Sequence, residues 1–310
     1  MKIKHIVSCF FVSLIGLSAC SIEELPYNQL TEDELDGSYE SLLSATRGNY
    51  AVFKQTAFHQ GWHYAGELAS DNVSLSGVSS DALMYIYNYQ RITDNYHMSN
   101  MWGWAYRSII NSNKILEKAQ EGESKEMDQL IGENYFLRGW LEFVLVNVFG
   151  RPYNQSPETN LGIPLKLTAD INDYPMRSTV KESYEQILKD LKKAETLLNS
   201  ESNIYAGPSA AKALLSRVYL YMGNNKLAAE YATEVIESSG RTLLEGEAYA
   251  TANVLVPEDN PEIIFAIRCT KDKDDYGWNS IGGFYANIDG VGWGAVSYTH
   301  LRAHETVLDL

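Results

Sequence analysis

The sequence predicts a mainly α-helical protein made of stacked helix pairs, with irregular loops and a few short strands. Apolar residues recur at spacings of three and four over most of residues 101–238, and capping residues, glycines and prolines separate these segments. Two neighbouring helices in this region have the dimensions of a tetratricopeptide hairpin. The 310-residue chain is 45% apolar, which is enough to bury a sizeable core.

The first half of the chain contains three segments with a helical pattern. A first helix is expected over about 38–55. The next runs to about Lys118, with one stripe formed by Trp102, Tyr106, Ile109 and Asn113. A third begins near Lys125 and stops at Gly150 and Pro152; its shared face holds Leu130, Leu137, Leu141, Val144 and Val148.

The second half contains a capping box and a helix hairpin. Thr179 and Glu182 begin a helix that runs to Leu198, because the hydroxyl and the carboxylate satisfy free amides in its first turn. Helices over 209–222 and 226–238 form the hairpin. The repeat's leucine, aromatic, glycine and alanine are matched by Leu215, Tyr219, Gly223 and Ala228. Asn225 departs from the pattern, because an aromatic residue is usual there.

Other segments read as irregular. Residues 56–100 contain several glycines and many polar residues, which predicts loops. Within them, the alternation of Tyr85, Tyr87 and Tyr89 predicts a short strand or an extended loop. Residues 153–176 and 276–294 are also expected to be irregular, and the apolar run 261–267 reads as a short buried strand.

The chain begins with the features of an exported lipoprotein. A basic start and an apolar run over 6–17 precede Leu17-Ser18-Ala19-Cys20, which resembles a lipobox. We expect residues 1–19 to be a signal peptide, Cys20 to carry the lipid, and residues 20–37 to form a tether. Glu23 and Glu24 resemble the signal that exports Bacteroidota lipoproteins to the cell surface. The alternative is an ordinary secretory leader with a chance cysteine.

Charge and cysteine content narrow the classes of partner. A net charge of −15 argues against nucleic acid and anionic membranes, which both require a basic surface. Cys9 is lost with the leader and Cys20 is lipidated, so Cys269 has no partner for an internal disulfide. Cys269 is interpreted as a small buried residue near a strand end rather than a nucleophile.

Several segments, in order, resemble SusD/RagB proteins. The stripe from Trp102 to Asn113 is similar to one of that family, as is the block Gly132–Trp140, in which Asn134 and Gly139 replace alanines. The turns Phe149-Gly150-Arg151-Pro152 and Gly162-Ile163-Pro164-Leu165, the helices that follow, and Asn260-Pro261-Glu262-Ile263-Ile264-Phe265 complete the series. The resemblance covers roughly 20–295. It implies a SusD-like helical domain over 38–296, incomplete at its carboxyl end because family members are longer.

The resemblance also implies a function. Such proteins are lipoproteins of the outer membrane, exposed at the cell surface, that capture a glycan or, in some members, an oligopeptide. They deliver it to a SusC-type TonB-dependent transporter, against whose barrel the helix pairs pack. They use no cofactor and are not enzymes.

The candidate ligand-binding residues lie in segments predicted to be loops. Asp71, Asn72, Tyr89 and Tyr96 are expected to line the pocket, where polar groups bond hydroxyls and a ring stacks on a sugar face. The alternative for the Asp and Asn is capping of the loop. Trp62 and Trp278, also in predicted loops, are further candidates. The tryptophans on predicted helices are expected to pack in the core; they are Trp102, Trp104 and Trp140.

Two other functions are open to a sequence of this kind. A glycoside hydrolase needs two carboxylates across a cleft, and no motif here isolates such a pair. The sequence also lacks a Gly-x-Ser-x-Gly elbow, a phosphate loop and a Rossmann fingerprint. A tetratricopeptide scaffold that binds only protein is the stronger alternative, and it predicts a concave helical surface without exposed aromatic loops.

Residues 297–310 do not continue the family pattern and resemble translated sequencing-adaptor read-through, so we expect a non-native tail there. The tail contains His300 and His304 beside Glu305, a spacing that imitates a zinc site. A metalloprotease helix reads His-Glu-x-x-His, whereas this segment reads His-Leu-Arg-Ala-His. No metal site is therefore expected.

Overall fold

The computed structural model describes residues 35–75, 81–270, 272–274, 277–285 and 295–297. The chain divides after Asp36 into two units, and the elements below all belong to the second, Gly37–Leu310. The predicted signal peptide, Cys20 and nearly all of the tether lie outside the described residues. Within the described ranges, no helix is both long enough and apolar enough to cross a membrane.

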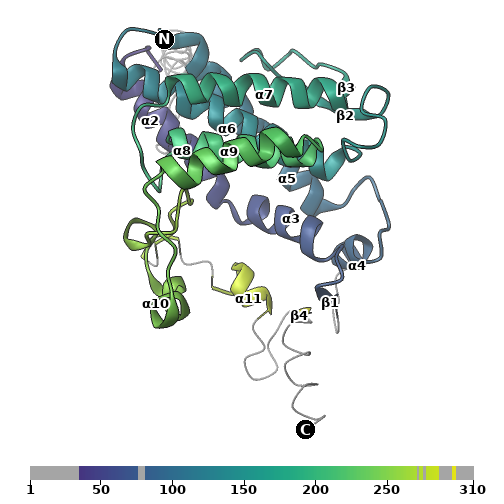
Figure 1. Ribbon diagram of the computed structural model, residues 1–310. Helices are drawn as coiled ribbons and strands as arrows, with labels where there is room; N and C mark the ends of the chain where they lie inside the picture. Colours follow the sequence, from purple (N-terminus) through teal and green to yellow (C-terminus); the bar gives the residue numbers. More distant parts are fainter. Residues whose placement is uncertain (1–34, 76–80, 271, 275–276, 286–294, 298–310) are drawn as a thin grey trace, which may run out of the picture. The chain divides into compact units, whose positions relative to one another are not determined.

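The protein is mainly helical, as predicted (Figure 1). The helices are α2 (Tyr39–Tyr50), α3 (Thr56–Glu67), α4 (Asp81–Tyr87), α5 (Tyr96–Lys118), α6 (Lys125–Phe149), α7 (Val180–Leu197), α8 (Pro208–Tyr221), α9 (Asn225–Ser238), α10 (Gly246–Ala250) and α11 (Ile281–Tyr285). Short 3-10 helices are η1 (Ala51–Lys54), η2 (Ala252–Val254), η3 (Pro257–Asp259) and η4 (Gly277–Asn279). Two antiparallel pairs join β1 (Val73–Leu75) to β4 (Ala295–Ser297) and β2 (Leu161–Pro164) to β3 (Arg177–Thr179).

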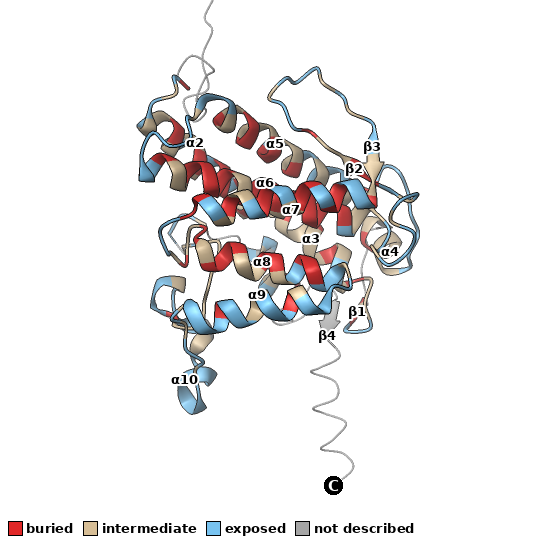
Figure 2. Ribbon diagram, turned by 45° about the horizontal axis from the view of Figure 1, so that its top comes forward, coloured by how far each residue is buried: buried red, intermediate tan, exposed pale blue. Residues whose placement is uncertain are grey.

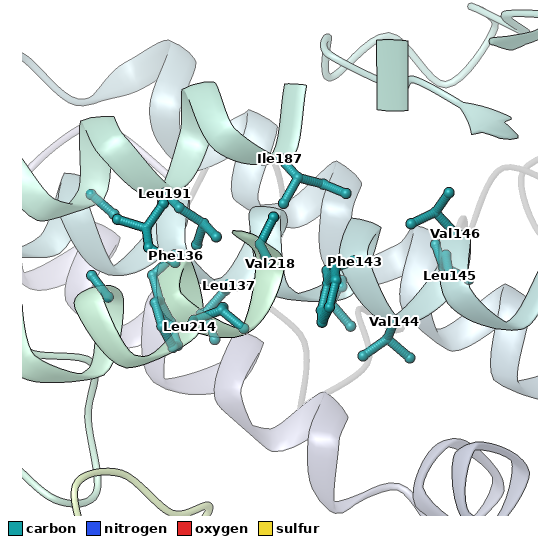
Figure 3. Close-up of a cluster of buried hydrophobic side chains, with 14 of the residues drawn as sticks. Phe136, Leu137, Phe143, Val144, Leu145, Val146, Ile187, Leu191, Leu214 and Val218 are labelled. Atoms are coloured by element: carbon teal, nitrogen blue, oxygen red, sulfur yellow. The ribbon is translucent and has the colours of Figure 1, made fainter. Parts of the chain in front are cut away.

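Consecutive long helices pack on one another, so that α5, α6, α7, α8 and α9 form a continuous stack. Helix α6 lies inside the stack, and α9 exposes most of its surface to solvent (Figure 2). Figure 3 shows Phe136, Leu137 and Phe143 of α6 among side chains of α7 and α8. Each helix pair buries its apolar stripe against the next pair, which is why a single hairpin would not suffice.

Small residues allow α6 and α7 to approach closely. A Cβ added at Gly139 would lie 3.1 Å from Leu191 Cδ2, and one at Gly132 would lie 3.0 Å from atoms of Leu198. The glycine at position 139, where the family block has alanine, therefore fits the close contact with α7. The other departure, Asn134, donates to the Thr46 hydroxyl at 2.8 Å and so connects α6 to α2.

A buried ionic group connects α5, α6 and α7. Arg138 donates two hydrogen bonds to Asp190, at 2.6 and 2.7 Å, and a third to Asn113 Oδ1 at 2.6 Å. Asn113 in turn donates to the carbonyls of Lys166 and Thr168, which fixes the segment after β2. Both oxygens of buried Glu142 lack a hydrogen-bond partner among the described residues. Burial, and then the charge of Asp190, raise the pKa of Glu142 well above its usual value.

The capping box and the tetratricopeptide-like hairpin are confirmed. The Thr179 hydroxyl accepts from the Glu182 amide at 3.1 Å, and the Glu182 carboxylate accepts from the Thr179 amide at 2.8 Å. In the hairpin, Tyr219 and Ala228 are buried, and Gly223 has a φ of +76°. A left-handed residue of this kind ends a helix most easily when it is glycine.

The prediction of loops over 56–100 is wrong, because this segment contains α3, α4 and the first turn of α5. Phe58, Gly61, Tyr64 and Leu68 form a buried stripe with spacings of three, three and four. The stripe passes through Gly61, and glycine is a residue type that more often indicates a loop. Tyr85 and Tyr87 lie on α4, which ends at Tyr87, so this part of the tyrosine alternation is helical and forms neither a strand nor an extended loop.

Three further expectations are corrected by the structure. The run 261–267 forms no strand; it is half-buried and begins with a turn. The Ala266 amide donates to the Asn203 carbonyl, and the Pro261 carbonyl accepts from the Thr242 amide. Cys269 is exposed rather than buried. The irregular segment 153–176 contains one regular element, β2, which pairs with β3. An apolar pattern indicates burial but not whether a second strand lies within reach.

Candidate functional site

An open pocket of about 330 Å³ lies where α3, α4, α5 and the segment 277–285 meet. Its lining is mixed, with aromatic rings beside amide and hydroxyl groups, as is common for small-molecule sites. The lining residues are Thr56, Ala57, Gln60, Tyr64, Leu83, Tyr96, His97, Asn100, Asn279 and Phe284.

The walls of the pocket depend on a close contact between α3 and α5. A Cβ added at Gly61 would lie 2.8 Å from Met101 Cβ and 2.9 Å from the His97 carbonyl oxygen. Asn95 then caps α5, because its side-chain oxygen accepts from the amides of His97 and Met98 at 3.2 and 3.4 Å. The same side chain donates to the Ala82 carbonyl at 2.8 Å, which connects α5 to α4.

The fourth wall of the pocket is the segment 277–285, which lies more than two hundred positions after α3 in the sequence. Gln60 Nε2 donates to the Asn279 carbonyl at 2.6 Å, across a separation of 219 residues. His63 Nε2 and the Tyr285 hydroxyl are 2.7 Å apart, and the rings of Tyr64 and Phe284 have centroids 4.8 Å apart. These contacts bring Asn279 and Phe284 to the pocket.

The described lining residues carry no charge at neutral pH. None of them is Lys, Arg, Asp or Glu. Burial lowers the pKa of His97 to about 4, so its imidazole is neutral, and Nε2 is buried without a hydrogen-bond partner in the described structure. Burial also raises the pKa of Tyr64 to about 12, so this phenol stays protonated. The pocket therefore offers neutral donors, acceptors and rings.

The structure brings some of the sequence-predicted residues to the pocket. Tyr96 lines it and keeps 53% of its surface exposed. Trp278 directly precedes the lining residue Asn279 in η4, and its side chain is outside the described part of the structure. These two positions are 182 apart in the sequence numbering, and the fold brings their backbone segments to the same pocket.

Asp71, Asn72 and Tyr89 lie together elsewhere, outside the pocket lining. The Tyr89 hydroxyl donates to the Ala69 carbonyl at 2.5 Å, and the Asn72 amide donates to the Ser70 hydroxyl at 3.2 Å. Tyr89 is 69% exposed, with a φ of +57°. These residues form an exposed group beside the turn after α3, and their role in binding stays a proposal.

Trp62 was expected in a loop, but it lies on helix α3. Its ring packs edge-on against Trp140 and is tilted against Phe58, with centroids 6.0 and 6.3 Å away. Trp102, Trp104 and Trp140 also pack against the core, as predicted. Trp62 thus contributes to the support behind α3 rather than to the pocket lining.

Four polar lining residues were not among the sequence-predicted candidates: Gln60, His97, Asn100 and Asn279. A signal for two of them exists, since Asn95–Asn100 combines a helix cap, two rings and two amides within six positions. Gln60 carries no comparable signal, because its place in the pocket depends on a helix that was not predicted.

The fold and the pocket define the class of this protein: a stack of helix pairs with an open pocket whose described lining is uncharged. The SusD-like family, described as starch-binding and associating with the outer membrane, matches residues 22–220. This match covers more than half of the chain, so the chain belongs to the SusD-like family.

Solved structures of this superfamily have the same fold. A SusD superfamily protein from Bacteroides thetaiotaomicron VPI-5482 is 28% identical with a TM-score of 0.77, over 87% of this chain and 62% of that one. Another from Bacteroides fragilis is 27% identical with a TM-score of 0.65, over 76% and 56%. A laminarin-binding SusD-like protein shares the fold at 23% identity and a TM-score of 0.56, over 66% and 46%.

The chain thus spans 62% or less of the length of these three proteins. No curated protein sequence matches it significantly. The predicted lipobox lies before the residues matched by the family. At the other end, His300 and His304 of the predicted tail lie outside the described residues. Ser297, the first residue of that tail, is the last residue of β4.

Proposed function

We propose that this protein is a surface lipoprotein of the outer membrane that captures a glycan and delivers it to a SusC-type TonB-dependent transporter. The observation that carries the proposal is the open pocket, whose lining includes the exposed Tyr96 together with Gln60, Asn100 and Asn279. An exposed ring can stack on a sugar face while amides bond its hydroxyls. Membership in the SusD-like family supports the same function.

Two comparisons strengthen the choice of glycan over other ligands. The family is described as starch-binding, and one protein with the same fold binds laminarin. Both of these ligands are polysaccharides. An oligopeptide, the other ligand class expected from the sequence, remains an outcome of the binding experiment.

Capture without catalysis is the proposed mode of action. Hydrolysis of a glycosidic bond requires two carboxyl groups on either side of the bond. The described lining residues include no Asp or Glu that could form such a pair. The glycan would therefore leave the pocket unchanged, and the transporter would receive it intact.

Removal of the exposed ring should weaken capture. In the full chain, Tyr96→Ala should reduce affinity for the retained glycan about tenfold, because one stacking contact contributes roughly 1.4 kcal/mol. Trp278→Ala is expected to act in the same direction. Retention in affinity gels containing starch, laminarin or other polysaccharides measures the effect. Tyr174→Ala is the matched control, since Tyr174 is 83% exposed and is not a lining residue.

Unchanged retention in both Tyr96→Ala and Trp278→Ala would remove these residues from the site. Depletion of the polysaccharide by purified protein would instead favour a hydrolase. Binding to proteins or peptides with no retention by any polysaccharide would favour the scaffold or the oligopeptide alternative.

Lipid attachment at Cys20 accounts for the proposed location. Cys20→Ser should move the protein from the membrane fraction to the soluble fraction and abolish labelling with radioactive palmitate, because buried acyl chains provide the anchor. Cys269→Ser is the matched control, since this exposed thiol lies far from the leader in the sequence and its variant should keep the label. A Cys20→Ser variant that still carries label and stays with the membrane would refute the anchor.

A further inference from the structure

The pocket is polar but uncharged, and this combination limits the kind of glycan that it can hold. The described lining has amides at Gln60, Asn100 and Asn279, a hydroxyl at Thr56 and a phenol at Tyr96. These groups bond hydroxyls as donors or acceptors. A carboxylate or sulfate placed among them would lose part of its hydration without gaining a cation.

The basic groups of α3 and of the residues just before it do not supply that cation. Lys54, which ends η1 just before α3, forms an ion pair with Asp274 at 3.0 Å. His59 and His63 lie on α3, and burial lowers the pKa of both imidazoles. His97, within the lining, is neutral for the same reason.

The charge of the chain acts in the same direction. A net charge of −15 creates a potential that disfavours the approach of anions. The two contributions are independent, since one concerns the lining and the other the whole chain.

We propose that this pocket selects an uncharged glycan unit, such as a neutral hexose, and excludes uronic acid and sulfated units of the same size. This inference rests on the proposed function, because it specifies which glycans the same pocket takes. The selectivity arises from the amide-rich lining, whose described residues include no Lys or Arg.

The test uses pairs of oligosaccharides that are equal in length and linkage and differ only at carbon 6. One member carries a hydroxymethyl group and the other a carboxylate, as in glucan against glucuronan, galactan against galacturonan and mannan against mannuronan. Isothermal titration of the full chain against each pair should show the neutral member bound at least about tenfold more tightly wherever a pair binds.

A charge-introducing variant makes the test independent of the choice of sugars. Asn100→Arg places a cation on an exposed lining position of α5. For any oligosaccharide pair that binds, the variant should improve the affinity for the acidic member about tenfold and so narrow or reverse the preference for the neutral member. Thermal unfolding of the variant checks that the fold is kept. Gln155→Arg, at an exposed position outside the lining, is the control for a general change in net charge and should leave the preference unchanged.

The outcomes separate the two proposals. Tight binding of an acidic member by the unaltered protein, equal to or above that of its neutral partner, would overturn the selectivity and leave glycan capture standing. Absence of binding to every member of every pair, with polysaccharide retention also absent, would overturn glycan capture itself and the selectivity with it. Retained polysaccharides that are all uronate-rich or sulfated would overturn the selectivity alone.

Discussion

Replacing Arg138 with Met should reduce the free energy of unfolding by about 3–5 kcal/mol, because the carboxyl groups of Asp190 and Glu142 would remain buried without their cation. Arg138 is 7% exposed, and it also holds Asn113, which binds the carbonyls after β2. Urea denaturation followed by circular dichroism measures the loss. Arg217→Met, at an exposed position of α8, should change stability by less than about 0.5 kcal/mol.

The loss in free energy of unfolding caused by Arg138→Met should grow with pH. Burial already raises the pKa of Asp190 and of Glu142 in the folded protein, and loss of the guanidinium would raise both further. A carboxyl group whose pKa is higher when folded favours the folded state below its unfolded pKa and loses this contribution as pH rises. The deficit should therefore be larger at pH 8 than at pH 5.

A second replacement distinguishes the loss of the cation from the loss of packing. Changing Arg138 to Met together with Asp190→Leu and Glu142→Leu removes the stranded carboxyl groups and should recover most of the stability. A loss of under about 1 kcal/mol in Arg138→Met alone, or a deficit that shrinks from pH 5 to pH 8, would contradict this account of the ionic group.

Replacing Gly61 with Ala should destabilise the protein by about 1–3 kcal/mol and weaken glycan retention at the same time. The new Cβ would lie 2.9 Å from the His97 carbonyl oxygen, a backbone atom, so α3 and α5 must separate. These helices form two walls of the pocket, and their separation would displace His97 and Gln60. Thermal unfolding and affinity-gel retention measure the two effects.

Gly66→Ala on the same helix is the matched control. A Cβ there would meet nothing within 4 Å, so the change should increase stability by up to about 1 kcal/mol through helix propensity. If Gly61→Ala were as stable as Gly66→Ala and retained the glycan equally, the contact between α3 and α5 would not position the pocket.

The sequence alone predicted the elements whose signals are local. The helix starting at Val180 was identified because Thr179 and Glu182 satisfy each other's backbone within one turn. The long helix from Lys125 to Phe149 was identified because its apolar spacing and its stop at Gly150 both lie within the segment itself. The same kind of reasoning located the tetratricopeptide-like hairpin to within one residue at each end.

The tertiary structure alone decided which distant segments meet. By itself Gly61 indicates a loop, but in the structure α5 lies against it. The run at 261–267 has the pattern of a strand, but no described segment pairs with it as one. Gln60 and Asn279 become neighbours only through a contact across 219 residues. Hydrophobic periodicity reports that a residue is covered, but it carries no information about which part of the chain covers it, and the pocket is made of such contacts.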